Sequence, residues 1–214
     1  MLNPKRLLLC IIMILAISLG ASLTIKASIG VGAWDALAVT GNNLFDIKVG
    51  TLQMILNFVC VAIQLVLLKK DFRIRHVLQV GLSILLGVTV NFVLYNLLGR
   101  VELTSYLSRL VIFILGNLIN GFSMAIIMML DVVTFPLEGA CMAIARRFGF
   151  EFHKVRQYSD IAFIAIVLLT FIIIKDTLSI REGTVISMLI YGPIMGFFMK
   201  RLKPFFQKYN LTDL

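Results

Sequence analysis

Two acidic residues, Asp35 and Glu138, each stand a few residues after a long apolar stretch, where a short helix is expected to begin. A carboxylate that faces a polar cavity in a membrane can bind a proton, a metal cation or a cationic substrate, because an ionisable group at membrane depth is costly and tends to be functional. In the first turn of a helix the same group would instead stabilise the positive end of the helix dipole, by about 0.3–1 kcal/mol. The depth of the two acids in the membrane decides between these interpretations.

Two further polar residues, Asn57 and Asp160, lie on the apolar stretches that follow the two acids. The residues that we predict to line a ligand or ion site are Trp34, Asp35, Asn57, Glu138 and Asp160. For Asn57 the alternative is a helix-to-helix hydrogen bond, worth about 0.6 kcal/mol in membrane proteins. Asp160 could pair with Arg156, one helical turn earlier.

Six apolar stretches carry or flank these residues, and each is long enough, or nearly so, to cross a bilayer. A hydrocarbon core of about 30 Å needs about 20 helical residues, with a lower limit near 17. The composition agrees, because 60% of the residues are hydrophobic and 14% are charged. The stretches lack the alternation of barrel strands, so we predict an all-α integral membrane protein. The predicted transmembrane helices are 7–25, 50–68, 77–98, 110–130, 158–174 and 183–199.

The first stretch has a basic flank, Lys5 and Arg6, which is also typical of a secretory signal peptide. Five more apolar stretches follow it and the stretch is long, so we expect it to be retained as the first transmembrane helix.

The net charge of +9 follows the predicted topology. Of the 20 lysines and arginines, 14 fall near one set of helix ends and six near the other. The positive-inside rule then places both termini in the cytoplasm, in a multi-pass protein of the plasma membrane. Topology explains the basic excess, so no nucleic-acid partner is expected.

The two acidic motifs occupy matching places in the two halves of the chain. An offset of 103 residues places Asp35 on Glu138 and Asn57 on Asp160. Each half has a long span, a motif broken by Gly or Pro, a short helix and two more spans. Three spans per half would insert the second half upside down, so we predict an inverted 3+3 repeat with a short re-entrant or interfacial helix after spans one and four. The predicted boundaries are 1–106 and 107–214 for the halves, 33–45 and 136–148 for the short helices, and 200–214 for a cytosolic tail.

At these motifs the chain resembles the YczE/YyaS/YitT family of bacterial integral membrane proteins. Family members have a glycine-rich approach to a Pro-Trp-Asp-like motif, and a Gly-Pro-x-Asp-Gly-like motif in the second half. Here Ala33 stands at the usual proline and Glu138 at the usual aspartate. The resemblance implies a membrane location and an architecture rather than an activity. The residues expected to shape the motifs are Gly30, Gly32, Gly50, Pro136 and Gly139, with Gly30 and Gly32 permitting backbone turns and Pro136 starting a helix.

Several classes of function find no motif in this sequence. It has no phosphate-binding glycine loop, no zinc-protease motif and no hydrolase nucleophile motif, so an enzyme is not expected. The three cysteines and two histidines have no metal-ligand spacing, so we expect neither a metal nor a cofactor.

Paired broken segments in inverted halves are typical of transporter binding sites, so we expect a small-molecule or ion transporter. The alternative is a non-transporting accessory or ligand-capture subunit of a larger complex. The expected partners are the lipid bilayer and an unknown small-molecule or ion ligand, and a homo-oligomer or a membrane protein partner stays open.

Overall fold

The structure is a computed structural model that describes residues 4–174, 179–209 and 211 of the 214 in the chain. Throughout that part of the chain the secondary structure is helical and contains no strand. The helices are α1 (Pro4–Ala27), α2 (Ala33–Phe45), α3 (Val49–Leu68), α4 (Ile74–Asn91), α5 (Tyr106–Leu130), α6 (Pro136–Phe148), α7 (Phe152–Ile174) and α8 (Glu182–Lys208). A 3-10 turn at Lys69–Asp71 follows α3, and a π-helical segment at Phe92–Leu97 continues α4.

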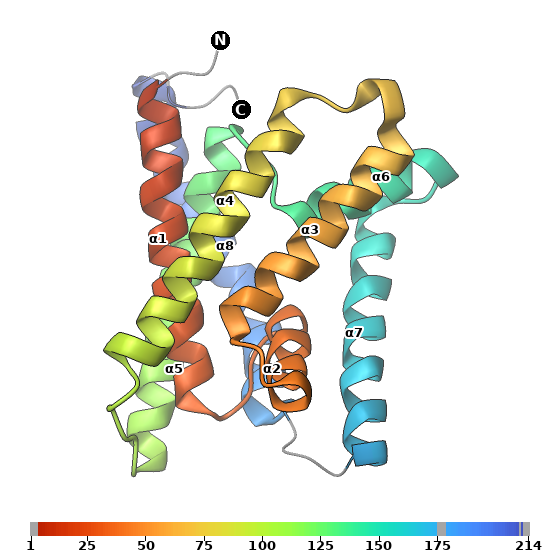
Figure 1. Ribbon diagram of the computed structural model, residues 1–214. Helices are drawn as coiled ribbons and strands as arrows, with labels where there is room; N and C mark the ends of the chain where they lie inside the picture. Colours follow the sequence, from red (N-terminus) through yellow and green to blue (C-terminus); the bar gives the residue numbers. More distant parts are fainter. Residues whose placement is uncertain (1–3, 175–178, 210, 212–214) are drawn as a thin grey trace.

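Six of these helices, α1, α3, α4, α5, α7 and α8, are long and apolar enough to cross a membrane. This confirms the predicted all-α class and the six apolar spans. The long helices alternate in direction, and the start of α1 lies at the same end of the bundle as the end of α8 (Figure 1). The short helices α2 and α6, of 13 residues each, lie toward opposite ends (Figure 1).

When the sequence is shifted by 103 residues, the ends of α1 and α5, both ends of α2 and α6, and the starts of α3 and α7 coincide. The residue after α1 is Ser28 and the residue after α5 is Asp131, and both have left-handed φ angles, 55° and 46°. Asp46 after α2 and Gly149 after α6 likewise have φ angles of 53° and 72°. The bounds of α2 and α6 are those predicted for the two short helices, 33–45 and 136–148. The repeated helix stops support a repeat of local structure, and the inverted relation between the halves stays a prediction.

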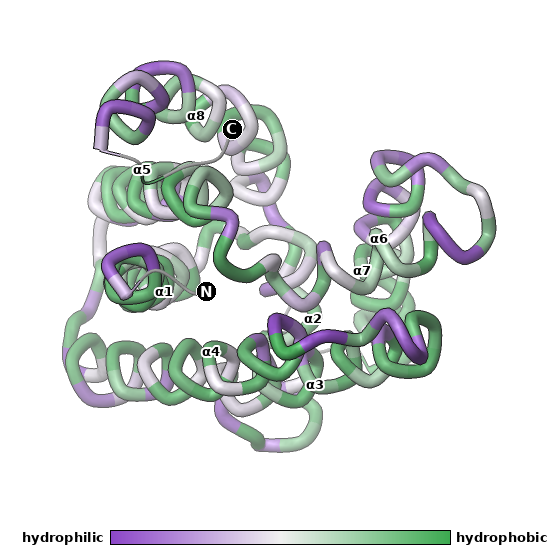
Figure 2. The backbone as a smooth tube through the Cα atoms, turned by 90° about the horizontal axis from the view of Figure 1, so that it is seen from above, coloured by the Kyte–Doolittle hydropathy of each residue, from purple (hydrophilic) through white to green (hydrophobic). Residues whose placement is uncertain are grey.

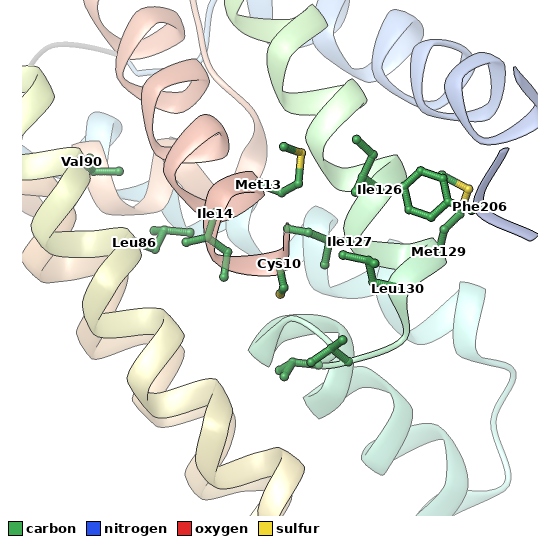
Figure 3. Packing of buried hydrophobic residues seen from close by; sticks show 12 residues of the cluster. Cys10, Met13, Ile14, Leu86, Val90, Ile126, Ile127, Met129, Leu130 and Phe206 are labelled. Carbon is green, nitrogen blue, oxygen red and sulfur yellow. The ribbon is translucent and has the colours of Figure 1, made fainter. Parts of the chain in front are cut away.

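The centre of the bundle is the contact between α1 and α5, with α4 and α8 on either side of that pair. Small residues permit the central contact, because a Cβ at Gly116 would lie 2.8 Å from the backbone oxygen of Gly20. The largest apolar cluster includes Cys10 of α1, Leu86 of α4 and Phe206 of α8 (Figure 3). The end of α8 is therefore joined to this cluster through Phe206, which lies beside Ile126 and Met129 of α5 (Figure 3).

Equivalent helices of the two halves make equivalent contacts, with one exception. α3 packs on α6 and α2 packs on α7, while α1 packs on α4 and α5 packs on α8. α3 also packs along α4, but α7 and α8 contact each other weakly at most within the described residues. Figure 2 shows α3 beside α4, and α7 well apart from α8.

The last two helices extend beyond the spans that hydropathy predicts. α7 begins at Phe152, six residues before the predicted start at 158, because its first turns carry charged residues that lower the hydropathy. α8 continues to Lys208, so most of the predicted tail 200–214 is helical, while residues 210 and 212–214 of that tail lie outside the described residues.

Candidate functional site

A cavity of about 410 Å³ lies inside the bundle, and residues from all eight helices α1 to α8 line it. Its volume is within the range of small-molecule pockets, roughly 300–1,000 Å³. The sequence-predicted residues that line this cavity are Trp34, Asp35, Asn57, Glu138 and Asp160, which is the complete predicted set. The bundle thus brings together residues that are up to 126 positions apart in the sequence.

On the first-half side, the cavity is formed by the start of α2 and the adjoining face of α3. Asp35 lies in the first turn of α2, and its Oδ1 accepts a hydrogen bond of 2.9 Å from Nε2 of Gln53. Gln53 is only 2% exposed, and its Oε1 is buried without a hydrogen-bond partner among the described residues. Among the residues that the structure describes, the side chain of Asp35 therefore has a neutral amide, and no cation, as its partner.

The pKa of the Asp35 carboxyl lies close to neutral pH. α2 is not among the six candidate spans, and burial of the side chain raises the pKa of Asp35 to about 6, against the smaller opposing effect of the hydrogen bond from Gln53. A carboxyl with such a pKa can gain or lose a proton, or exchange it for another cation, near neutral pH.

On the second-half side, the start of α6 meets the first turns of α7. Glu138 lies in the first turn of α6, and its Oε1 is 3.6 Å from Nε of Arg156. Arg156 also forms an ion pair with Asp160, one turn further along α7. These three side chains are 28–30% exposed, so they border the open part of the cavity. The second carboxylate thus has a fixed positive charge beside it, unlike Asp35.

The polar residues of the two sides are equivalent in sequence. At the offset of 103 residues, Asp35, Gln53 and Asn57 correspond to Glu138, Arg156 and Asp160. Each short helix supplies one acid, and the helix that follows it supplies that acid's partner. The site is therefore assembled from the same places in both halves, with different side chains.

The glycine and proline residues of the motifs have distinct roles in the structure. Gly30 has a φ of +122°, and a Cβ there would lie 2.6 Å from the backbone nitrogen of Thr184 at the start of α8, so this position requires glycine. Gly32 differs from expectation, because its φ is −58° and the space for a Cβ is open. Pro136 occupies the first turn of α6, as expected, where its missing N–H is not needed.

Gly50 and Gly139 hold helices close together. A Cβ at Gly50 would collide with the carbonyl oxygen of Gly87, where α3 and α4 cross. A Cβ at Gly139 would collide with the side chain of Gln64, whose Nε2 donates to the carbonyl oxygen of Pro136 at 3.0 Å. These two glycines set the distance of α4 and of α6 from α3.

Sequence reasoning missed part of the cavity lining. The pair of Asp160 with Arg156 that the sequence offered as an alternative is present, but the contact of Arg156 with Glu138 across the cavity was not predicted, because Arg156 was counted among the cations at cytosolic helix ends. The position of Arg156, 103 residues after Gln53, is a signal that could have found it. Tyr191 of α8 also lines the cavity and had no signal in the sequence.

Within residues 4–174, 179–209 and 211, no group of three or more His, Cys, Asp or Glu side chains is arranged to hold a metal ion.

The fold and the cavity fit a multi-pass helical membrane protein. The chain belongs to the family of unknown function DUF6198, which matches residues 4–200. It is 24% identical over 197 residues to the uncharacterized protein YyaS of Bacillus subtilis (strain 168), an alignment that covers 92% of this chain and 94% of that one. The resemblance to the family of YyaS that the motifs predict is thus confirmed. No solved structure matches this chain.

Proposed function

We propose that this protein is a membrane transporter for a small molecule, and that the cavity is its substrate site. The observation that carries the proposal is the assembly of one cavity from equivalent polar positions of the two halves. In transporters built from inverted repeats, the substrate site lies near the bilayer midplane, at the interface of the repeats, and is formed by interrupted helices. α2 and α6 are the counterparts of such interrupted helices.

The length and packing of α2 and α6 support a re-entrant position. A helix of 13 residues is about 20 Å long, too short to cross a core of about 30 Å. α2 packs mainly against α3 and α7 and also contacts α1, and α6 packs mainly against α3 and α7 and also contacts α4. Each short helix has a motif that lines the cavity. Interrupted backbone is tolerated at membrane depth where protein covers it or a cavity adjoins it.

The proposed orientation has both termini in the cytoplasm and the protein in the plasma membrane. The shared end of α1 and α8 supports the first part, since six crossings return the chain to its starting side (Figure 1). Because Arg156 lines the cavity, it is left out of the count of surface charges. The lysines and arginines then divide 13 to six in favour of the proposed cytosolic side.

An accessory or ligand-capture subunit is the second candidate. It is favoured by α7, in which only Val155 and Val167 are buried among 23 residues. Such an uncovered helix could contact lipid, a second copy of the chain or another membrane protein. A capture subunit needs access to the cavity from one side only, whereas a transporter needs it from both.

Access to the cavity separates the two candidates. In a variant with Cys10, Cys60 and Cys141 changed to alanine, Met124→Cys places a thiol in the cavity lining. Its matched control is Met128→Cys, one turn further along α5, at a side chain that is 48% exposed on the outer surface. A membrane-impermeant methanethiosulfonate reagent is then applied to right-side-out or inside-out vesicles.

A transporter predicts that Met124→Cys reacts from both sides of the membrane and that Met128→Cys, facing lipid, reacts from neither. Reaction of Met124→Cys from one side alone would support the capture subunit and contradict transport. Absence of reaction from both sides would contradict a water-accessible substrate site altogether.

A further inference from the structure

The two acids of the cavity differ in how their charge is balanced. Glu138 has the guanidinium of Arg156 at 3.6 Å, but in the described part of the chain Asp35 has only the amide of Gln53, at 2.9 Å. Arg156 is the one cation among the described residues that line the cavity, and it already contacts two acids. An ionised carboxylate that is taken out of water needs a positive partner. The first-half side of the cavity therefore has room for a positive charge from a ligand.

Gln53 provides an independent sign of a missing ligand. Its side chain is 2% exposed, its Nε2 is engaged by Asp35, and its Oε1 has no donor among the described residues. Buried acceptors are normally hydrogen-bonded, and an exception calls for an explanation. A ligand group with several N–H donors would satisfy both the Gln53 Oε1 and the Asp35 carboxylate.

The rest of the lining indicates what the ligand carries beside this group. Trp34 adjoins Asp35, and the indole face attracts cations. Leu86, Met124 and Phe135 supply an apolar wall. With a volume of about 410 Å³, the cavity is far larger than a bare ion requires and can hold an organic ligand.

We propose that the cavity binds an organic ammonium, with its N–H groups at Asp35 and Gln53 and its hydrocarbon part against Leu86, Met124 and Phe135. This inference rests on the proposed function, since it names the substrate class of the same cavity. Selectivity for ammonium over neutral and anionic ligands follows from the acid excess on the lining. The side bearing Arg156 contributes shape and orientation, because the guanidinium of Arg156 already lies beside both of its acids.

The test measures equilibrium binding to the purified full-length chain in detergent at pH 8, by calorimetry. The probes are phenethylamine, the neutral alcohol 2-phenylethanol and the anion 3-phenylpropanoate, which have closely similar skeletons. The alcohol also controls for partition into the micelle. The proposal predicts that phenethylamine binds at least about tenfold more tightly than either analogue. Equal binding, or a preference for the alcohol or the anion, would overturn it.

A pair of variants assigns the binding to the first-half acid. Asp35→Asn should weaken phenethylamine binding at least about tenfold. The matched control is Asp46→Asn at the other end of α2, where an exposed residue of left-handed conformation tolerates asparagine, and binding there should be unchanged. Equal losses in both variants would contradict the assignment.

Gln53→Met keeps the assignment testable if Asp35→Asn does not fold. It removes the unpartnered acceptor while keeping the length of the side chain, and it should also weaken amine binding; unchanged binding would contradict the role of Gln53. Loss of amine preference together with two-sided labelling of Met124→Cys would refute this inference and leave the transporter standing. One-sided labelling of Met124→Cys with amine preference retained would refute the transporter and leave the amine site standing.

Discussion

The two polar sides of the cavity have the same backbone frame but differ in the partner beside the acid of the short helix. In both halves an acid stands in the first turn of a 13-residue helix, and its partner stands 18 positions later on the next long helix. The partner is the neutral Gln53 in the first half and the charged Arg156 in the second. On the second side one guanidinium lies beside two carboxylates, whereas Asp35 has no cation beside it among the described residues. A duplicated frame can therefore divide the tasks of structure and binding between its copies.

The halves also differ in how their second and third long helices meet. In the first half, Gly50 and Gly87 bring α3 and α4 into contact, and Oδ1 of Asn91 accepts a hydrogen bond from the Gly50 amide at 2.9 Å. In the second half, α7 stands apart from α8 (Figure 2). Met188 and Gly192 of α8, both exposed, line the cavity beside this separation. The second half is therefore the side on which the cavity is less enclosed.

The largest expected effect comes from making the first half a copy of the second. Gln53→Arg places a guanidinium beside Asp35, which fills the position proposed for the ligand's ammonium and repels it. We expect phenethylamine binding to weaken by about 100-fold or more, since like charges in a desolvated site cost several kcal/mol. Calorimetry measures the loss, with Gln53→Met as the milder control. Retention of wild-type affinity would contradict the proposal that the missing cation beside Asp35 distinguishes the two sides.

The close contact of α3 with α4 predicts that a larger residue at position 50 destabilises the protein. Gly50→Ala forces a Cβ into the carbonyl oxygen of Gly87 and should lower the free energy of unfolding by about 1–3 kcal/mol. Gly81→Ala on α4 is the matched control, because the space for its Cβ is open. Thermal unfolding in detergent compares the two variants. Equal stability would mean that α3 and α4 are not held as closely as the structure has them.

The protonation of Asp35 predicts a pH dependence of amine binding. Burial raises the pKa of Asp35 to about 6, so the carboxylate is charged above that pH and neutral below it. A primary amine stays protonated over this range, as lysine does with a pKa near 10.4. Affinity should therefore be constant above about pH 7 and fall by up to about tenfold per pH unit below pH 6.

Asp35→Asn is the control for this profile, because it should leave only the weaker contributions of the other charged groups at the cavity, Glu138, Arg156 and Asp160. A wild-type affinity that rises as the pH falls below 6 would have the wrong sign for a carboxylate ligand of an ammonium.

The smallest expected effect lies in the loop before α2. Gly32→Ala should change the free energy of unfolding by less than about 0.5 kcal/mol, since the φ angle is ordinary and the equivalent position in the second half is Phe135. Gly30→Ala should cost about 1 kcal/mol or more, because of its φ of +122° and its contact with Thr184. Thermal unfolding of both variants tests the contrast, and a greater loss at Gly32 would contradict it.

The sequence allowed much of the frame to be predicted. Apolar stretches locate the six long helices because a span must be continuous, and the Gly or Pro before each acid locates the starts of α2 and α6. The five predicted site residues come together because equivalent positions of the two halves face the same interior. That they bind a ligand stays a prediction.

The remainder could not be read from the chain. Arg156 lies near a helix end in sequence, and a count of charges does not tell whether a side chain points to water or into a cavity. Gln53 is one of several amide residues on the long helices, and its bond to Asp35 and its buried, unpartnered Oε1 are known only from the structure. Similarly, neither hydropathy nor the 103-residue offset indicates that α3 contacts α4 while α7 stands apart from α8, because pairing depends on the close approach that Gly50 and Gly87 allow.

The central claim is that an ammonium ligand occupies the side of Asp35 and not the side of Glu138. A crystal structure with bound 4-bromophenethylamine tests it most directly, because anomalous scattering locates the bromine independently of the protein. The account predicts a bromine peak at the apolar wall of Leu86 and Met124, with the ammonium nitrogen within hydrogen-bond distance of Asp35 and Gln53. A bromine peak outside the cavity, or a nitrogen beside Glu138, would contradict it.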